Sequence, residues 1–281
     1  MKKKGLRLII CTTLMTAMLG SFAGCGDSSN KDGNGDKSVK ISVSGSTSVG
    51  PLMEKIAESY EKENKNVSIE INQVGSSAGI QDTINGVAEL GMSSRDLKDE
   101  EKSKGIQGTE IAYDGIAVIV HPDNKVGNLT LEQLKDIYTG KITNWKEVGG
   151  VDKPIVVVSR EEGSGTRDAF QEIVGYDSSE LIPDATITDA SGNLMTTVAQ
   201  NKNAIGFVSF SYINDTVNAI KLNDVEATEE NAKNGTYKLS RPFLIVTKED
   251  TLSDEGQKVI DYILSDKGQE IVKEDKLITI K

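Results

Sequence analysis

The stretch VVVSREEGSGTRDAF, residues 156–170, carries the most informative pattern in the sequence. An apolar run ends at Arg160, a loop of glycine and hydroxyl residues follows, and an amphipathic segment begins at Thr166. This succession predicts a β-strand, a short loop and an α-helix. The backbone N–H groups in the first turn of a helix have no intrahelical partners, and the helix dipole adds partial positive charge there. The loop is therefore a candidate anion site.

Two other stretches repeat this succession, SVSGSTSVGPL at residues 42–52 and NQVGSSAGI at residues 72–80. Each places small hydroxyl residues and glycine where a predicted strand passes into a predicted helix. One such loop alone could be an ordinary helix cap, because serine and threonine are preferred there. Three of them favour one shared anion site, since the carboxyl ends of the strands in an open α/β sheet form the ligand crevice.

The rest of the chain alternates short apolar strands with amphipathic helices, which predicts an α/β fold with mostly parallel sheets. Two long extended runs, at residues 109–120 and 242–248, are expected to cross between two lobes and to leave a cleft between them. We predict that residues 38–116 and 246–281 form the first lobe, against which the C-terminal helices pack. Residues 117–245 are predicted to form the second lobe.

The composition is that of an ordinary globular chain, with 281 residues of which 37 % are hydrophobic. The formal net charge of −11 makes nucleic acid an unexpected partner, because binding to a phosphate backbone requires a basic surface. Any anion must therefore be held by local donors and helix dipoles, and not by the overall charge of the protein.

The N-terminus resembles a bacterial secretion signal. Residues 1–24 combine a basic start with a short apolar stretch and small residues, which predicts a signal peptide and not a spanning helix. The ending FAGC resembles a lipobox, so Cys25 is predicted to carry a lipid; the alternative is ordinary cleavage that leaves Cys25 unmodified. Residues 25–37 form a polar, flexible linker in this interpretation. The protein would then be anchored on the extracytoplasmic face of the cell membrane, and its formal charge without the four basic residues of the signal would fall to −15.

Arginines near the loops could supply the positive charge for an anion. Arg160 and Arg95 each present a planar fork that suits a tetrahedral oxyanion. Either could instead form a surface ion pair with acidic residues that are near in sequence, and Arg167 could point to solvent. Glu161 and Glu162 are expected to form a solvated face beside Arg160.

Asp114 is an acidic residue in a mostly apolar run. A buried carboxylate beside an anion repels it, unless the anion carries a proton that it can donate. Hydrogen phosphate carries such a proton at neutral pH and sulfate does not, so an unpaired acceptor would favour phosphate. The alternatives are that Asp114 caps a loop or pairs with an arginine.

Enzymatic alternatives find less support in the sequence. The P-loop pattern is absent, and no GxGxxG motif opens a helix after a strand. A phosphoester hydrolase that used Ser164 or Ser46 would need a general base, and the single histidine, His121, is expected on a loop. With no histidine and cysteine cluster, we predict neither a metal site nor a cofactor.

Several stretches together resemble the phosphate-binding proteins of bacterial high-affinity phosphate ABC transporters. These are SGSTSVGPL, VGSSAGI, GMSSRDL, YDGIAVIV, LKDIYTGKITNW and SREEGSGTRDAF, and the resemblance covers roughly residues 38–281. It implies a two-lobed, periplasmic-binding-protein-like (type II) α/β fold that closes on one phosphate in a cleft between the lobes. The segment IYTGKITNW resembles a structural signature of the family and not a ligand contact.

The resemblance also implies ligand contacts, position by position. The first two loops contribute Thr47, Ser48 and Ser76, and the opening stretch contributes Arg160, Ser164, Gly165 and Thr166. A further loop of the family, which matches GMSSRDL in this chain, often has an acidic acceptor. This chain has Ser94 at that place, followed by Arg95. We therefore predict Ser94 and Arg95 as further contacts and Asp114 as the substitute acceptor, with Asp96 as the alternative.

The predicted function is that of a lipid-anchored, monomeric receptor that captures inorganic phosphate and passes it to the permease subunits of an ABC transporter. It is not predicted to be an enzyme. The alternatives are a receptor for another oxyanion, such as sulfate or molybdate, and a phosphoester hydrolase.

Overall fold

The computed structural model describes residues 38–281. The predicted signal peptide of residues 1–24, the lipid anchor at Cys25 and the linker of residues 25–37 lie outside the described residues. In the described part of the chain, no helix is both long and apolar enough to cross a bilayer.

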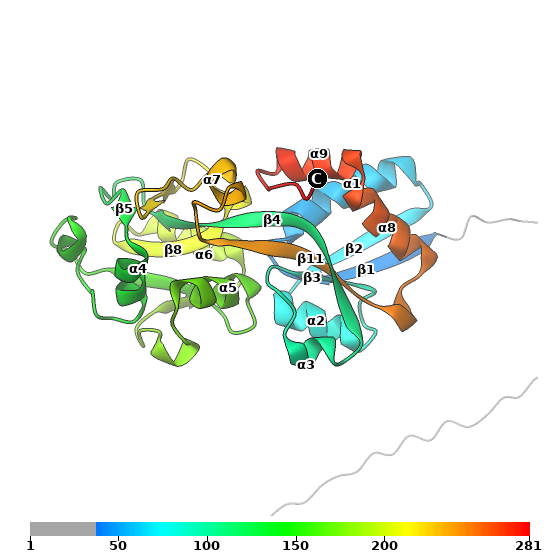
Figure 1. Cartoon of the computed structure of the whole chain (residues 1–281), viewed down its shortest axis with the longest axis horizontal. Helices are drawn as coiled ribbons and strands as arrows, with labels where there is room; N and C mark the ends of the chain where they lie inside the picture. The colour runs from blue at the N-terminus through cyan, green and yellow to red at the C-terminus, as the bar shows by residue number, and fades with distance from the viewer. Residues whose placement is uncertain (1–37) are drawn as a thin grey trace, which may run out of the picture. The chain divides into compact units, whose positions relative to one another are not determined.

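The first lobe begins with strand, helix, strand, helix, strand, as the opening loops predicted (Figure 1). Strand β1 pairs in parallel with both β2 and β3, and the helices α1 and α2 connect these strands. Two helices from the C-terminus, α8 and α9, pack against the same core. The elements are β1 (Val39–Gly45), α1 (Gly50–Glu63), β2 (Val67–Gln73), α2 (Ser76–Ile84), β3 (Leu90–Ser93), α3 (Asp99–Lys102), α8 (Asp254–Leu264) and α9 (Asp266–Glu274).

The second lobe repeats the arrangement around a parallel trio of strands, in which β6 pairs with β7 and β8. Its core includes Phe170 and Phe207, whose rings stack at 4.1 Å between centroids. Tyr138 and Trp145 are fully buried there, so the segment IYTGKITNW is structural, as expected. The elements are α4 (Leu131–Tyr138), β6 (Val156–Arg160), α5 (Gly165–Val174), β7 (Thr186–Thr188), α6 (Ser191–Gln200), β8 (Ala204–Ser209) and α7 (Glu229–Lys233), with the short strands β5 (Asn128–Leu129), β9 (Asn218–Ala219) and β10 (Lys221–Leu222).

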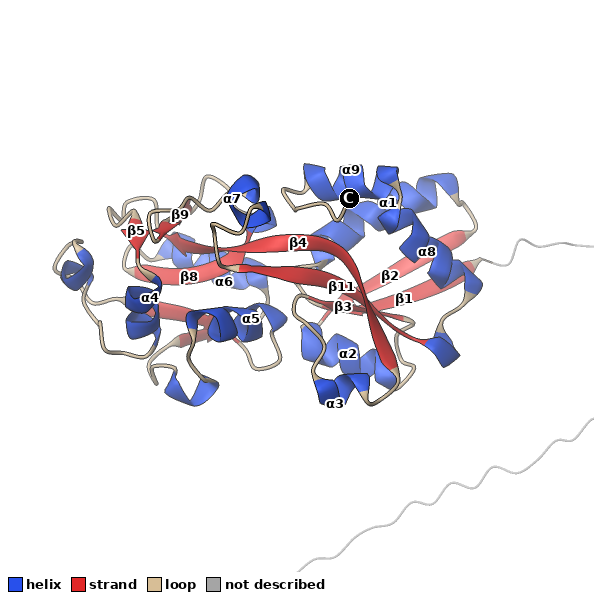
Figure 2. Ribbon diagram, in the orientation of Figure 1, coloured by secondary structure: helices blue, strands red, loops and turns tan. Residues whose placement is uncertain are grey.

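Two long strands, β4 (Ile106–Val120) and β11 (Ser240–Lys248), run side by side between the lobes (Figure 2). The first part of β4 pairs with β11, and from Ile116 onward β4 pairs with β8 of the second lobe. The predicted crossovers are thus confirmed. Because β4 and β11 are antiparallel to each other and to their neighbours, the sheet is mixed and the parallel pairing holds only inside each lobe.

Each lobe has its own buried core. The core of the first lobe draws on residues 41–112 and 243–277, and that of the second on residues 116–239 together with Ile278. The short segments 113–115 and 240–242 lie between these sets on the two crossover strands. They are the places where the chain passes from one lobe to the other.

Candidate anion-binding site

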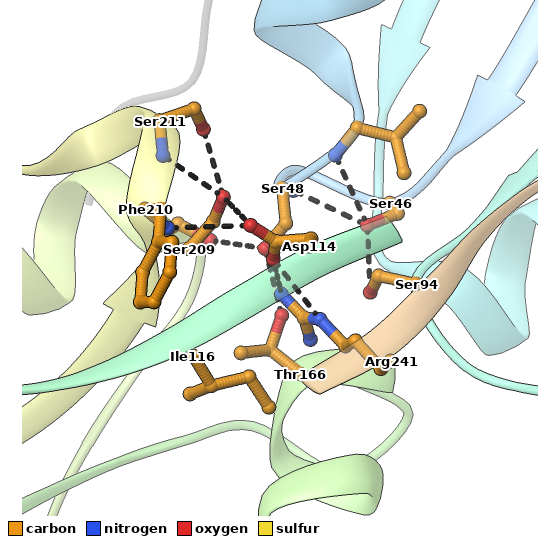
Figure 3. A network of polar contacts seen from close by, with 12 residues as sticks. Ser46, Ser48, Ser94, Asp114, Ile116, Thr166, Ser209, Phe210, Ser211 and Arg241 are labelled. Carbon is orange, nitrogen blue, oxygen red and sulfur yellow. Dashed lines mark hydrogen bonds and ion pairs between the residues drawn. The ribbon is translucent and has the colours of Figure 1, made fainter. Parts of the chain in front are cut away.

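Hydroxyl side chains from the three predicted loops meet in one buried group, of which Figure 3 shows Ser46, Ser48, Ser94 and Thr166. Ser46 donates to Ser94 at 2.9 Å, and Ser94 lies 3.3 Å from the hydroxyl of Ser76. Ser48 reaches across to Thr166 of the second lobe, with 2.7 Å between the two oxygens. We call this group, which also includes Thr47 and Ser191, the hydroxyl cluster; its members are Ser46, Thr47, Ser48, Ser76, Ser94, Thr166 and Ser191.

Four helices begin at the hydroxyl cluster, namely α1, α2, α5 and α6. Ser164 is the N-cap of α5, and its hydroxyl accepts from the backbone N–H of Arg167 at 3.3 Å. The first residue of α5 is Gly165, where a Cβ atom would lie 2.3 Å from the Ser76 hydroxyl oxygen. The N-terminal ends of helices carry free N–H groups and partial positive charge, so the convergence of four such ends creates an environment for an anion.

Arg160 lies at the centre of this arrangement and is 1 % exposed. Its guanidinium donates to Ser191 at 2.9 Å and to Thr47 at 3.2 Å. On its other edge it forms two hydrogen bonds of 2.7 Å with the carboxylate of Glu161. Glu161, expected to be a solvated neighbour of Arg160, is half-buried, and its carboxylate also orients Arg160; Glu162 is exposed.

Arg167 is also buried, which corrects the suggestion that it points to solvent. It is 5 % exposed, and its guanidinium donates to the backbone oxygen of Arg160 at 3.0 Å. Arg167 thereby holds the end of β6, from which the Arg160 side chain projects.

Arg95 does not contact the hydroxyl cluster through its guanidinium in the way predicted. Its two terminal nitrogens donate to Glu101 at 2.7 and 2.9 Å, and also to Ser77 and to the backbone of Asp96. Its Nε lies 3.0 Å from the carboxylate of Asp168 on α5. All three nitrogens of the guanidinium thus face partners outside the hydroxyl cluster. The structure therefore corrects Arg95 from an anion contact to an ion pair that joins the two lobes.

Asp114 is fully buried, but its carboxylate is already saturated (Figure 3). One oxygen accepts from the Ser209 hydroxyl at 2.7 Å and from the Phe210 N–H at 3.3 Å. The other accepts from two nitrogens of Arg241, at 2.9 and 3.2 Å. Burial raises the pKa of Asp114, and the Arg241 guanidinium and these hydrogen bonds oppose that rise. The predicted role of Asp114 as an open acceptor of a phosphate proton is thus contradicted, and the alternative of pairing with an arginine holds.

Sequence reasoning missed three residues of this region. Ser191 opens α6, and its signal was present, because a strand, small residues and a helix follow each other there as in the other loops. Tyr212 donates across the lobes to the backbone oxygen of Thr47 at 2.7 Å, and burial raises the pKa of Tyr212 to about 12, which keeps this donor protonated. Arg241 had no local signal, because its partnership with Asp114 depends on the register between β11 and β4.

Two kinds of feature could support catalysis or metal binding, namely a histidine and a cluster of metal-ligating side chains. His121 accepts the backbone N–H of Asp123 at 2.9 Å through its ring. Among residues 38–281, no group of three or more histidine, cysteine or acidic side chains is placed to hold a metal ion. The arrangement around Arg160 presents donors from both lobes to an oxyanion, because its guanidinium meets Ser191 of one lobe and Thr47 of the other.

The comparisons with known proteins agree with this geometry. The family model described as the PBP superfamily domain matches residues 29–267, so the protein belongs to this superfamily. A substrate-binding protein from Clostridium perfringens, solved with bound phosphate, is 60 % identical, with a TM-score of 0.85 over 86 % of this chain and 100 % of that one. A phosphate transport receptor from Vibrio cholerae is 36 % identical, with a TM-score of 0.72 over 85 % of this chain and 99 % of that one.

A curated relative, the phosphate-binding protein PstS of Bacillus subtilis, is 32 % identical over 98 % of this chain and 94 % of its own length. The chain belongs to the family of PstS phosphate-binding proteins. The resemblance inferred from the sequence and the two-lobed fold class are thereby confirmed.

Proposed function

We propose that this protein captures inorganic phosphate between its lobes and delivers it to the permease subunits of an ABC transporter. The observation that carries the proposal is the buried guanidinium of Arg160, which meets hydroxyl groups of both lobes at Ser191 and Thr47. The names of its relatives and the phosphate bound in the Clostridium perfringens structure support the choice of ligand.

Binding and closure are linked in this mechanism. A ligand that touches both lobes binds the closed arrangement better than an open one, so it shifts the protein toward closure. Thr47, Ser48 and Ser76 approach from the first lobe, and Arg160, Thr166 and the N-terminus of α5 approach from the second. Hydroxyl groups can both donate and accept, so the hydroxyl cluster can also receive the proton of hydrogen phosphate.

A receptor for sulfate or molybdate is the second candidate. Two carboxylates near the site are already paired, Asp114 with Arg241 and Glu161 with Arg160. Neither is then free to accept a proton from phosphate, and an anion without a proton, such as sulfate, needs no such acceptor. Isothermal titration of the purified protein with phosphate, sulfate and molybdate distinguishes the candidates. We expect one phosphate per chain and weaker binding of the other two; preferred binding of sulfate or molybdate would replace phosphate as the proposed ligand.

We further propose that the protein is a receptor and not a hydrolase. The hydroxyls of the site bond to one another, to backbone groups or to arginine, and His121 is engaged with its own loop. Turnover of a generic phosphoester that disappears in Ser164→Ala would overturn this part of the proposal.

The interlobe ion pair between Arg95 and Asp168 is expected to stabilise the closed form. We predict that Asp168→Asn weakens phosphate binding by about 5–30-fold, between the effects typical of exposed and of buried pairs. The loss should shrink at high salt, because screening already weakens the pair in the unmodified protein. The control is Asp152→Asn, which breaks the exposed pair with Lys146 and should leave affinity unchanged. Equal affinities for Asp168→Asn and the unmodified protein would show that this pair has no part in closure.

We also propose that the mature protein is a monomer held on the outer face of the cell membrane by a lipid on Cys25. The support is the sequence of residues 1–37, with its signal-like start, its lipobox-like ending and its polar linker. Labelling cells with a palmitate analogue should mark the protein and should fail to mark Cys25→Ser. Labelling of both would place the lipid elsewhere.

A further inference from the structure

The buried guanidinium of Arg241 lies in the region that Figure 3 shows together with members of the hydroxyl cluster. Arg241 is 3 % exposed and stands on the crossover strand β11, directly opposite Asp114 on the crossover strand β4. The pair therefore belongs to the two strands that connect the lobes. Within residues 38–281, the side-chain hydrogen bonds of this pair join the two residues to each other and to Ser209 and Phe210, and not to the hydroxyl cluster.

The donors of Arg241 are only partly used. Its Nε and Nη2 both donate to one oxygen of Asp114, at 3.2 and 2.9 Å. Its Nη1 is buried and has no hydrogen-bond partner among residues 38–281. Buried donors are almost always paired, and a buried charged donor without a partner is costly. The Nη1 group thus has the character of a donor prepared for a ligand.

The position of this donor fits the anion site. Figure 3 shows the pair of Arg241 and Asp114 in the same close view as Thr166 and Ser48 of the hydroxyl cluster. Thr166 in turn bonds to Ser48 of the other lobe. Burial lowers the pKa of Arg241, Asp114 opposes that effect, and the positive charge of nearby Arg160 adds to it. Two guanidinium groups therefore share this region, and an anion would relieve their repulsion.

Asp114 fixes the direction of Arg241. The Ser209 hydroxyl and the Phe210 N–H hold one oxygen of this carboxylate, so the other oxygen meets Arg241 in one orientation. This leaves the Nη1 edge of Arg241 without a hydrogen-bond partner in the described part of the chain. Asp114 is in this arrangement a positioning residue and not a ligand contact.

We propose that Arg241 is a second arginine of the anion site, which donates through Nη1 to the bound oxyanion while Asp114 orients it. The inference rests on the proposed function and adds a contact from the strands that connect the lobes. The expected effect of Asp114→Asn is opposite in sign to that of a proton acceptor, because the amide oxygen of asparagine can still accept from Arg241 and orient it while the negative charge beside the anion is removed.

The test compares Asp114→Asn with the double variant Asp114→Asn, Arg241→Gln, so that no variant leaves a buried carboxylate unpaired. Phosphate titration should give equal or tighter binding for Asp114→Asn and binding about 10–100-fold weaker for the double variant, on the scale of a hydrogen bond to a charged group. The matched control is Asp152→Asn, Lys146→Gln, which removes the same charges from an exposed pair and should change nothing.

The outcomes separate this inference from the proposed function. If the unmodified protein fails to bind phosphate, sulfate and molybdate, the proposed function fails. If it binds phosphate and the double variant binds equally well, Arg241 is not a contact; if Asp114→Asn selectively loses phosphate over sulfate, Asp114 is an acceptor after all. If the variants do not fold, side-chain ¹⁵N spectra of the unmodified protein provide the test. Phosphate should shift the guanidinium signals of both Arg160 and Arg241. A shift of the Arg160 signal alone overturns the proposal.

Discussion

Replacing Arg160 with methionine is expected to weaken phosphate binding by about two to four powers of ten, the range found when one partner of a buried charged contact is removed. The guanidinium is 1 % exposed, so water cannot take its place. It also connects Thr47 of one lobe with Ser191 of the other, so its loss weakens closure as well as charge. Titration calorimetry measures the change directly.

The substitution Arg160→Met also leaves the Glu161 carboxylate without its partner beside the anion. The double variant Arg160→Met, Glu161→Gln removes this repulsion and should recover only a small part of the affinity. Lys146→Met is the control, because this lysine is exposed and lies in an unrelated pair. A change below about threefold for Arg160→Met would mean that Arg160 is not the principal cation of the site.

Gly165→Ala is expected to weaken phosphate binding by about 10–100-fold, the range that corresponds to overpacking of a close contact. The added Cβ would lie 2.3 Å from the Ser76 hydroxyl oxygen and 2.8 Å from that of Ser94, so the two lobes could not approach as closely. Both close contacts of the added Cβ would destabilise the closed, ligand-bound form. The midpoint of thermal unfolding without phosphate should change little, because alanine suits the first turn of a helix.

Gly127→Ala is the matched control, since nothing lies within 4 Å of a Cβ at that position. It should bind phosphate like the unmodified protein. If Gly165→Ala does so too, the lobes close on phosphate without the close approach between α5 and the first lobe.

The loops and Arg160 could be predicted from the sequence because their signals are local. A strand, a run of glycine and hydroxyl residues and a helix follow each other within about fifteen residues, and the helix N-terminus attracts anions wherever the helix packs. The close approach of Ser48 to Thr166 then follows from the fold, since the strands of each lobe end at the cleft. The family resemblance supplied the individual contacts.

The sequence left the roles of Arg95 and Asp114 open between alternatives, because the partners that decide them include residues far away in the chain. Arg95 meets Asp168 only when the lobes come together. Asp114 meets Arg241, 127 positions later, through the register of two antiparallel strands. The sequence offered an ion pair with a nearby acid as an alternative for Arg95 and an arginine partner as an alternative for Asp114, and the tertiary structure selects these alternatives.

A crystal structure of the protein grown with phosphate would show whether both lobes hold the anion around Arg160. We expect one phosphate between the lobes, with its oxygens within about 3 Å of the Arg160 guanidinium, the Thr47 and Thr166 hydroxyls and the N-terminal N–H groups of α5. Phosphate that contacts only one lobe, or that binds away from Arg160, would contradict the proposed mechanism.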